Sequence, residues 1–309
     1  MARIIGQSDR CKVEGMTTLP RMDAQPELFQ DVMARPMRPL LKWAGGKTQL
    51  LGALRRAMPT EFSRYAEIFC GGGALFWSLG LPGSFLADSN PELINFYEIV
   101  RDAPTELLSA VRELSVTKTD YYRIRGLDPI KLSDVDRAAR FVYLNKTCFN
   151  GLYRVNRKGQ FNTPYSGRTD SRVLDESDVQ TASRLLQQCT LTCADFTESL
   201  ASLREGDFVY LDPPYLPIGG YSDFRRYTKD FFNEEHHIRL AAEFSKLRGR
   251  GVKALLSNSA THRIRCLYKA HYCVTVMASR QISCNGDGRG RIPELMVANY
   301  PLELGNVVS

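Results

Sequence analysis

Short apolar runs bounded by turn-forming residues occur in two separate blocks of the chain. Runs of this length, rich in β-branched and aromatic residues, are typical of buried strands. They predict strands at residues 65–69, 84–87, 208–211, 252–257, 271–277 and 292–300, and one more that begins at Leu191.

Between the two blocks the apolar positions take the spacing of amphipathic helices. This pattern predicts helices at residues 91–101, 105–114, 120–125, 134–145 and 177–187. An irregular stretch, residues 146–168, separates the last two helices. Its turn at Asn156–Gly159 has flanks that suit a β-hairpin. A further amphipathic helix is expected at residues 234–247, after a long aromatic-rich loop that ends near Phe232.

The alternation of strands and helices predicts an α/β fold with a Rossmann-like sheet. We expect residues 38–90 and 188–309 to form the sheet together, and residues 91–187 to form a mainly helical insertion that carries the β-hairpin. Residues 1–37 show no hydrophobic period, which predicts a flexible tail.

The composition and charge of the chain indicate what kind of partner it binds. The 309-residue chain is 43% hydrophobic, which suffices for one sizeable core, and its formal net charge is +7. A positive charge favours an anionic partner. No apolar run approaches the length of a membrane span, the N-terminus has no secretory pattern, and the eight cysteines include no C-x-x-C pair. These features predict a reduced, intracellular protein.

One group of metal-binding residue types occurs late in the chain, at His262, Cys266, His271 and Cys273. Four such donors could bind zinc, but structural zinc sites show closely spaced ligand pairs, and this group does not. His271 and Cys273 also lie at a predicted strand, where a small buried cysteine is ordinary. We therefore predict no metal.

A glycine-rich turn, Cys70-Gly71-Gly72-Gly73, follows the first predicted strand and precedes a helical pattern. Strand, glycine turn and helix form the opening unit of a Rossmann-like half. Asp88 ends the second strand, at about the distance beyond the glycines at which such folds bind a ribose hydroxyl. The glycine pattern is not G-x-G-x-x-G, which argues against a dinucleotide. Glycine turns with a ribose-binding acid also occur in S-adenosylmethionine sites.

The run Gly206–Tyr215 ends a predicted strand with Asp212, followed by two prolines and Tyr215. The prolines cannot continue the strand, so the chain must turn out of the sheet there, at the edge where α/β folds bind ligands. Asp212 and the Pro213 carbonyl could accept the hydrogens of an exocyclic amine, and Tyr215 could stack on the ring. A strand followed by a proline-rich turn would also explain the pattern. Asp195 and Phe196 could likewise meet an adenine amine and face.

The segment Pro39–Thr48 ends in Gly-Lys-Thr, as a nucleotide triphosphate loop does, but that motif requires glycine where Leu41 stands. We therefore reject an ATPase. Lys47 offers a cation and Trp43 a flat face to a ligand. A helix N-terminus with a packing tryptophan is the alternative.

The predicted hairpin segment, residues 146–168, carries five basic residues and no acidic one. Phe149, Tyr153, Phe161 and Tyr165 alternate with them. Basic side chains neutralise phosphates, and aromatic ones wedge between bases or stack on them, which favours nucleic-acid recognition. A solvated hairpin whose aromatic residues pack on the domain would have the same composition.

Six ordered blocks between about Leu40 and Tyr300 resemble those of Dam-type DNA adenine-N6 methyltransferases. The blocks are Leu-Lys-Trp-Ala-Gly-Gly-Lys, Glu-Ile-Phe-Cys-Gly-Gly-Gly-Ala-Leu-Phe, Ala-Asp-Ser-Asn-Pro-Glu-Leu-Ile, Phe-Asn-Gly-Leu-Tyr-Arg-Val-Asn-Arg-Lys-Gly-Gln-Phe-Asn-Thr-Pro-Tyr-Ser-Gly, Ala-Asp-Phe and Asp-Pro-Pro-Tyr. The first glycine turn departs from the family's commoner Gly-x-Gly form, because Cys70 precedes three glycines. The resemblance implies a methyltransferase sheet and makes residues 91–187 the domain that recognises DNA.

The resemblance also implies the roles of individual residues. Those that would bind S-adenosylmethionine are Trp43, Lys47, Phe69, Gly71, Gly73, Asp88, Asp195, Phe196 and Asp212. Those that would grip a flipped adenine and support methyl transfer are Asp212, Pro213, Pro214 and Tyr215. Those that would contact DNA are Phe149, Asn150, Leu152, Arg154, Asn156, Arg157, Lys158, Pro164, Asn285, Arg289 and Arg291. Matches at Phe149, Leu152, Arg154 and Pro164 imply a GATC target in double-stranded DNA, with Arg154 as the candidate for reading guanine.

Further expectations concern the partners of this enzyme. Gln25-Pro26-Glu27-Leu28-Phe29 is similar to the short peptide with which bacterial proteins bind the replication sliding clamp. The resemblance implies a monomer that acts on cytoplasmic DNA in a bacterial cell, encoded by that cell or by a phage.

Two alternatives remain open at this point. RNA and protein-glutamine methyltransferases share the sheet but usually carry Asn-Pro-Pro-Tyr, and both Asp212 and the inserted hairpin argue against them. A DNA-binding protein on an inactive methyltransferase fold is the other alternative, and the intact Asp212–Tyr215 motif and Lys47 argue against it.

Overall fold

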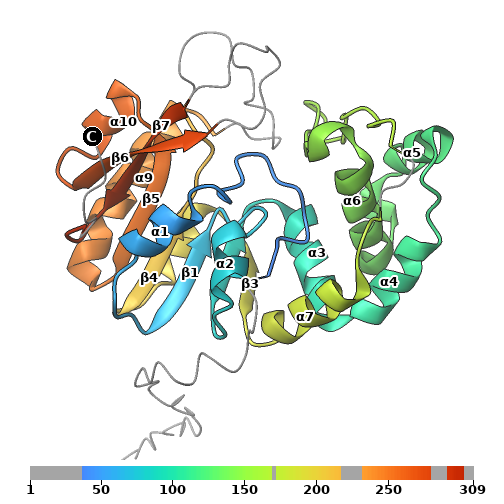
Figure 1. Ribbon diagram of the computed structural model, residues 1–309, viewed down its shortest axis with the longest axis horizontal. Coiled ribbons are helices and arrows are strands. Elements are labelled where there is room, and N and C mark those ends of the chain that lie inside the picture. The colour runs from blue at the N-terminus through green and yellow to red at the C-terminus, as the bar shows by residue number, and fades with distance from the viewer. Residues whose placement is uncertain (1–36, 169–171, 217–231, 280–290, 303–309) are drawn as a thin grey trace, which may run out of the picture.

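The computed structural model describes residues 37–168, 172–216, 232–279 and 291–302. Within them, seven strands form one mixed sheet in the order β3-β2-β1-β4-β5-β7-β6 (Figure 1). The strands are β1 (Arg64–Ile68), β2 (Phe85–Asp88), β3 (Thr190–Cys193), β4 (Asp207–Leu211), β5 (Lys253–Ser259), β6 (Tyr272–Ser279) and β7 (Arg291–Ala298). Strands β1 to β5 are parallel to one another, whereas β7 lies between β5 and β6 and is antiparallel to both. The order 3-2-1-4-5 is that of a Rossmann sheet, so the α/β prediction is confirmed.

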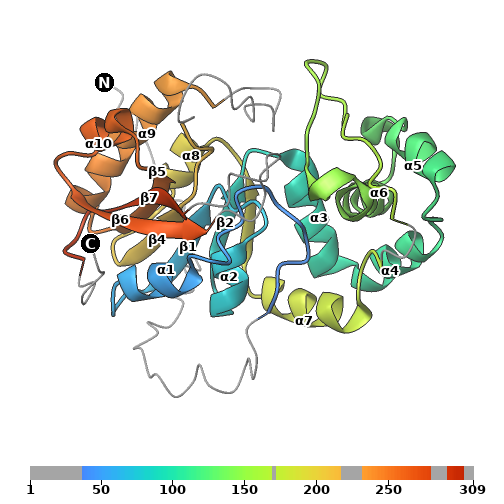
Figure 2. The same ribbon diagram turned by 45° about the horizontal axis from the view of Figure 1, so that its top comes forward.

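Helices cover both faces of this sheet because successive side chains of a strand point to opposite sides. Tyr65 and Tyr210 pack into one hydrophobic cluster, with side chains of α1 (Leu51–Ala57) and α2 (Ala74–Leu79). Ala66 and Val209 pack into a second cluster, with side chains of α8 (Phe196–Ala201), α9 (Glu234–Leu247) and α10 (His262–Leu267). The core therefore consists of two layers separated by the sheet, as Figure 2 shows from a second direction.

The chain between β2 and β3 forms the helical region at the right of Figure 1. Its α-helices are α3 (Pro91–Asp102), α4 (Pro104–Arg112), α5 (Lys118–Arg125), α6 (Asp134–Thr147) and α7 (Glu176–Leu186). Short 3₁₀ turns stand at η2 (Pro129–Lys131) and η3 (Phe149–Gly151), and η4 (Arg248–Arg250) follows α9. Each helix predicted here begins and ends within two residues of the observed bounds. Their apolar faces belong to the same cluster as α1 and α2.

Side-chain caps explain where several of these helices begin. Asn90 accepts a hydrogen bond from the main-chain N–H of Glu92, and Pro91 occupies the first position of α3. Ser133 caps α6 in the same way, and Asp175 caps α7. Because α3 begins directly after β2, Asp88 and Asn90 are brought to the edge of the sheet at which the parallel strands end.

The predicted hairpin is present as a reversal of the chain with little strand pairing. The turn forms where expected, since the N–H of Asn156 donates to the carbonyl of Gln160 at 2.8 Å. Only two isolated antiparallel bridges, Cys148 with Tyr165 and Val155 with Phe161, connect the two sides within the described residues. Asn150 has a left-handed backbone (φ 56°), which interrupts one side, so the strand ladder of the hairpin is short.

Several predictions concern residues outside the described ranges. These are the tail up to residue 36, the clamp-like peptide Gln25–Phe29, most of the loop before Phe232, and the DNA-contact candidates Asn285 and Arg289. Arg291 is the first residue of β7, and its side chain is likewise outside.

Candidate active site

The carboxyl ends of β1, β2, β3 and β4 lie side by side, because β1 pairs with both β2 and β4, and β2 pairs with β3. Asp88, Asp195 and Asp212 follow or end these strands and line one cleft. The opposite wall of the cleft comes from the loop before α1 and from the helical region. Its volume of about 3060 Å³ is several times the ~300–1,000 Å³ of a small-molecule pocket. The cleft is thus large enough for a cofactor and part of a macromolecule.

Asp212 is fixed at the end of β4 through one of its two oxygens. Its Oδ1 accepts from Lys47 Nζ at 2.8 Å and from Ser257 Oγ at 2.9 Å. Within the described residues no hydrogen bond reaches Oδ2. Burial raises the pKa of Asp212 above its usual value, and the Lys47 ammonium opposes this rise. The arrangement presents one oriented carboxylate oxygen to the cleft.

Tyr215 is held against the same lysine. Its ring centroid lies 4.6 Å from Lys47 Nζ, and its hydroxyl donates to Glu294 Oε2 at 2.6 Å. Glu294 lies on β7 and was not among the predicted site residues; burial raises its pKa. An acidic residue within an otherwise apolar strand was the sequence signal for it. Of the two prolines between Asp212 and Tyr215, Pro213 is buried and Pro214 is exposed.

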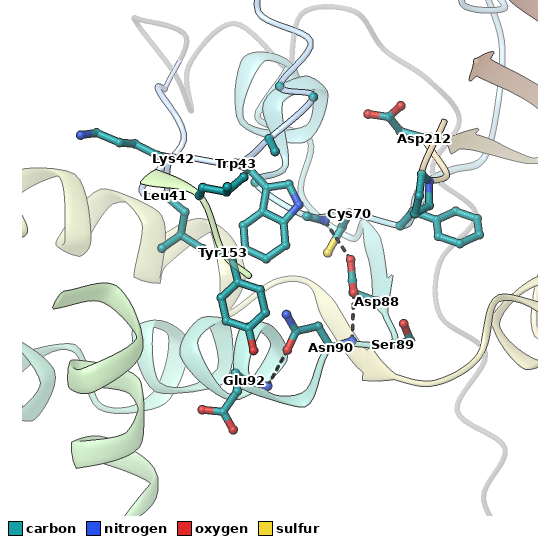
Figure 3. Close-up of a pocket in the computed structure, with 18 of the residues that line it drawn as sticks. Leu41, Lys42, Trp43, Cys70, Asp88, Ser89, Asn90, Glu92, Tyr153 and Asp212 are labelled. Atoms are coloured by element: carbon teal, nitrogen blue, oxygen red, sulfur yellow. Dashed lines mark hydrogen bonds between the residues drawn. The ribbon is translucent and has the colours of Figure 1, made fainter. Parts of the chain in front are cut away.

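Asp88 holds the glycine turn in place. Its Oδ2 accepts from the N–H of Gly71 at 3.0 Å, and its Oδ1 accepts from the N–H of Asn90 at 2.9 Å (Figure 3). Burial raises the pKa of Asp88. Gly71 has a φ of 47°, and a Cβ atom there would lie 2.5 Å from Trp43 Nε1. Backbone conformation and close approach of Trp43 therefore both require glycine at this position.

Asp195 and Phe196 form a second part of the cleft wall. Asp195 caps α8 by accepting from the N–H of Thr197, and its Oδ2 accepts from Arg239 at 2.8 Å. Burial raises its pKa, but the contacts with Thr197 and Arg239 outweigh it and hold the pKa below its usual value. The ring of Phe196 lies 5.5 Å from that of Phe69, so an acid and two aromatic rings meet at one point.

Glu67 is a buried acid that was not among the predicted site residues. It lies in β1, is only 2% exposed, and its Oε2 accepts from Tyr65 Oη at 2.6 Å and from the N–H of Phe76 at 2.9 Å. Burial raises its pKa to about 8. Glutamate in the middle of a buried strand is rare unless it is paired, and this was the signal that could have found it.

The hairpin carries its predicted DNA-contact residues on different surfaces. Phe149 is 53% exposed and borders the cleft, whereas Tyr153 and Phe161 pack against each other at 5.7 Å and Tyr165 packs on Tyr121. Three of the four aromatic residues thus pack on the domain, as the alternative reading of the composition held. The charged and polar candidates Asn150, Arg157 and Lys158 and also Pro164 are exposed, while Leu152, Arg154 and Asn156 are half-buried.

Arg154 is oriented by its neighbour across the hairpin. Its Nε donates to Asn162 Oδ1 at 2.7 Å. Asn156 stabilises the turn, because its Oδ1 accepts from the N–H groups of Lys158 and Gln160. Side chains that are already ordered lose less entropy when they bind, so these contacts favour a preformed recognition surface.

The four metal-ligand residue types near α10 do not converge. Cys266 Sγ lies 3.7 Å from the ring nitrogens of His262, whereas His271 interacts with Ser245 at 3.0 Å. In the part of the chain that the structure describes, no three His, Cys, Asp or Glu residues form a possible metal site. Among the same residues, no helix has the length and apolar character needed to cross a membrane.

Comparison with known proteins identifies the kind of site described above. Residues 43–282 match the family of D12 class N6 adenine-specific DNA methyltransferases. The chain belongs to this family. The resemblance noted in the sequence is confirmed, and the protein is a DNA adenine-N6 methyltransferase.

Three similar proteins carry different names. Type II methyltransferase M.MjaIII of Methanocaldococcus jannaschii is 39% identical, over 85% of this chain and 99% of its own. Type II methyltransferase M1.LlaDCHI of Lactococcus lactis is 37% identical, over 85% of this chain and 96% of its own. The DNA adenine methylase of Escherichia coli is 33% identical, over 85% of this chain and 96% of its own. Their names differ at similar identity, so none of them fixes the target sequence.

Proposed function

We propose that this methyltransferase transfers a methyl group from S-adenosylmethionine to N6 of an adenine within GATC in double-stranded DNA, and that it flips this adenine out of the helix. The observation that carries the proposal is the Asp212 carboxylate, which is fixed by Lys47 and Ser257 at the end of β4, beside Pro213 and Tyr215. A carboxylate oxygen and a carbonyl can accept the two hydrogens of an exocyclic amine, and Tyr215 offers its ring to the base.

The cleft contains the groups that an adenosine-bearing cofactor needs. Carboxylates at Asp88 and Asp195 can accept hydrogen bonds from ribose hydroxyls and from an adenine amine, and the rings of Phe69 and Phe196 supply an apolar wall. Asp88 already accepts two backbone hydrogen bonds, but each carboxylate oxygen has a further acceptor position. Trp43, Gly71 and Gly73 complete this wall. S-adenosylmethionine would supply an electrophilic methyl group on sulfur.

Asp212 would act by position and charge. Because Lys47 and Ser257 occupy Oδ1, the other oxygen can accept from the target amine and localise the lone pair on its nitrogen. The bound amine would then be held with its lone pair directed at the methyl group. Such orientation of the reacting groups is a large part of the rate enhancement in such reactions. Neither a metal nor a covalent link to the protein has a role in this proposal.

An adenine within a duplex cannot reach a carboxylate at the bottom of a cleft, so it must leave the base stack, at a cost of a few kcal/mol. Phe149 is exposed beside the cleft and could fill the vacated space. Leu152, Arg154 and Pro164 lie on the same segment and could read neighbouring bases. An arginine that contacts both acceptors of guanine is the commonest specific contact with DNA. In this proposal residues 91–187 form the recognition domain, and residues 38–90 with 188–309 form the catalytic domain.

The proposal is tested by measuring transfer of tritiated methyl from S-adenosylmethionine to two duplexes that differ only in containing GATC or GTAC. Label in the GATC duplex alone is the expected result. Label in both would retain the reaction and reject the sequence specificity. A third, single-stranded RNA substrate tests the RNA alternative, and label there without label in DNA would reject the proposed substrate.

A further inference from the structure

The segment Leu41–Trp43 contacts both the hairpin (residues 146–168, called the recognition hairpin below) and the glycine turn after β1. The N–H of Lys42 donates to Asn145 Oδ1 at 2.9 Å, and Asn145 Nδ2 donates back to the Lys42 carbonyl at 2.7 Å. Asn145 is fully buried at the end of α6. A Cβ atom on Gly151 would lie only 2.4 Å from Lys42 Cβ, so the hairpin backbone is packed tightly against this segment.

Trp43 is in contact with both sides of this connection. Its side chain lies against the glycine turn, where a Cβ atom on Gly71 would come within 2.5 Å of Trp43 Nε1 and one on Gly72 within 2.8 Å of Trp43 Cβ. It also stacks on Tyr153 of the hairpin, with ring centroids 5.7 Å apart and an angle of 15° between the planes (Figure 3). Trp43 therefore contacts both the glycine turn and the hairpin.

The other end of Tyr153 reaches the opposite side of the cleft. Figure 3 shows its hydroxyl pointing toward Asn90 and Glu92. The N–H of Asn90 donates to Asp88 Oδ1, and Asn90 Nδ2 is buried without a hydrogen-bond partner among the described residues. Tyr153 thus extends from Trp43 to the residue that holds Asp88. In the sequence it stands between Leu152 and Arg154, two of the residues proposed to read bases.

We propose that Tyr153 is a positioning residue that couples occupancy of the cofactor cleft to the placement of the recognition hairpin, acting through Trp43. The inference rests on the proposed function, because it takes Trp43 and Asp88 as cofactor-binding residues. A cofactor that fixes Trp43 favours the hairpin position that the stack selects, and DNA bound to that position favours the cofactor by the same factor.

The stack is a suitable carrier of such coupling. Tyr153 also packs on Phe141 and Phe161, at 5.4 and 5.7 Å, so its ring has few alternative positions. A leucine in its place would be smaller and would have no ring, so Trp43 and the hairpin could move independently.

The test compares the affinity for a GATC duplex with and without S-adenosylhomocysteine, which cannot transfer a methyl group. The ratio of the two dissociation constants is the coupling factor, and we expect at least about fivefold in the wild-type protein. Tyr153→Leu should lower this factor by about 2- to 12-fold. At about 1.4 kcal/mol per tenfold change, this range corresponds to the ~0.5–1.5 kcal/mol of an aromatic pair.

Two further variants separate coupling from a purely structural role. Tyr153→Phe keeps the ring and should keep the coupling factor. Tyr165→Leu removes an aromatic residue of the same segment that packs on Tyr121 and not on Trp43, and it too should keep the factor. Tyr153→Leu should leave the affinity for DNA alone, and for S-adenosylhomocysteine alone, within about threefold of wild type.

The inference is overturned if Tyr153→Leu keeps the wild-type coupling factor, or if it weakens DNA binding equally with and without S-adenosylhomocysteine. A wild-type factor of one would overturn the inference and leave the proposed function intact. If the wild-type protein fails to bind S-adenosylhomocysteine at all, the proposed cofactor is wrong, and this is visible before any variant is compared.

Discussion

Asp212 leaves one carboxylate oxygen available to the cleft because Lys47 and Ser257 both bind the other. Replacing Asp212 with Asn keeps the shape and an oxygen for these two donors but removes the negative charge that, in the proposed reaction, would orient the target amine. We expect kcat to fall by at least about 10²–10³-fold, the usual cost of losing one group that acts in the transition state. Affinity for DNA should stay within about threefold. Single-turnover methylation and equilibrium binding measure the two effects separately.

Ser257→Ala is the matched control for this variant. It removes one donor to Asp212 Oδ1 and leaves Lys47 in place, so kcat should fall by only about 2- to 10-fold, in line with one hydrogen bond of ~0.5–1.5 kcal/mol. If Asp212→Asn abolished DNA binding together with transfer, the role assigned to Asp212 would be wrong.

Glu67 should make the stability of the protein depend on pH. Its pKa in the folded state, about 8, lies above the ordinary value of 4.5, so the folded state holds the proton more tightly than the unfolded chain. Its contribution to the free energy of unfolding is therefore complete below about pH 4.5 and is lost as the pH rises through 8. Glu67→Gln keeps an oxygen for Tyr65 and Phe76 and cannot ionise. Between pH 6 and pH 9, Tm should fall more steeply for the wild type than for this variant.

Glu113→Gln, a change of an exposed glutamate at the end of α4, is the control and should keep the wild-type pH dependence of Tm. Equal slopes for the wild type and Glu67→Gln would mean that Glu67 is already ionised in the folded protein.

At the residue scale, the sequence located acids that end strands and missed acids inside strands. Asp88, Asp195 and Asp212 stand at turns, where the pattern of apolar residues stops and marks them. Glu67 and Glu294 lie within strands, and the partners that make their burial tolerable come from elsewhere: the N–H of Phe76 for Glu67 and the hydroxyl of Tyr215 for Glu294. Such pairings depend on tertiary structure, which the local pattern does not contain.

At the element scale, substitutions of two hairpin glycines compare the cost of backbone strain alone with the cost of strain plus close tertiary packing. Gly151 and Gly159 both have a left-handed backbone, with φ of 64° and 77°. A Cβ atom on Gly159 would meet nothing within 4 Å, whereas one on Gly151 would lie 2.4 Å from Lys42 Cβ. We expect Gly159→Ala to lower the free energy of unfolding by about 1–2 kcal/mol, the cost of the left-handed conformation alone. Gly151→Ala should cost about 1–3 kcal/mol more, because of overpacking.

Urea denaturation of both variants measures this difference, and binding to a GATC duplex shows its consequence. Gly151→Ala should weaken DNA binding more than Gly159→Ala does, since it displaces the hairpin from Lys42. Similar losses of stability in the two variants would contradict the tight packing of the hairpin against Leu41–Trp43.

The helices and strands were largely predictable from the sequence. The extent of strand pairing in the hairpin was not. Helices of the insertion have apolar faces and side-chain caps, such as Asn90 and Ser133, that are local in sequence. The strand ladder around the Asn156–Gly159 turn is short, because Tyr153 packs on Trp43 and Phe141, and Phe161 packs on Tyr153. Packing against another part of the chain outweighs local strand propensity there.

At the scale of the whole molecule, residues far apart in sequence meet around one cleft. Trp43 and Lys47 come from the loop before α1, Asp212 from the end of β4, and Phe149 from the insertion. The Rossmann-like class of the sheet could be predicted from the α/β pattern, and the family resemblance implied the roles. Neither could show that Trp43 stacks on Tyr153 or that Lys47 pairs with Asp212, because those contacts form only when the loop, the sheet and the insertion fold together.

Two basic residues of the hairpin should differ in how they contribute to the affinity of the whole protein for DNA. Lys158 is exposed at the turn, where a long flexible side chain can meet a phosphate but cannot hold one base-pair geometry. Lys158→Ala should weaken binding to all duplexes equally. It should also reduce the slope of log K against log salt by about one, since each neutralised phosphate contributes ~0.9. Arg154 is half-buried and is held by Asn162 at 2.7 Å, a geometry that suits base reading.

Arg154→Ala should therefore leave the salt slope unchanged and reduce discrimination at one base pair of GATC by about 1–3 kcal/mol. Asn162→Ala, which frees the Arg154 side chain without removing its charge, should reduce discrimination at the same base pair by a smaller amount. Titrations at several salt concentrations, with GATC and its single-base variants, separate the three outcomes. Discrimination that falls equally in Lys158→Ala and Arg154→Ala would mean that the hairpin contributes charge alone, and sequence reading would then have to come from another part of the cleft.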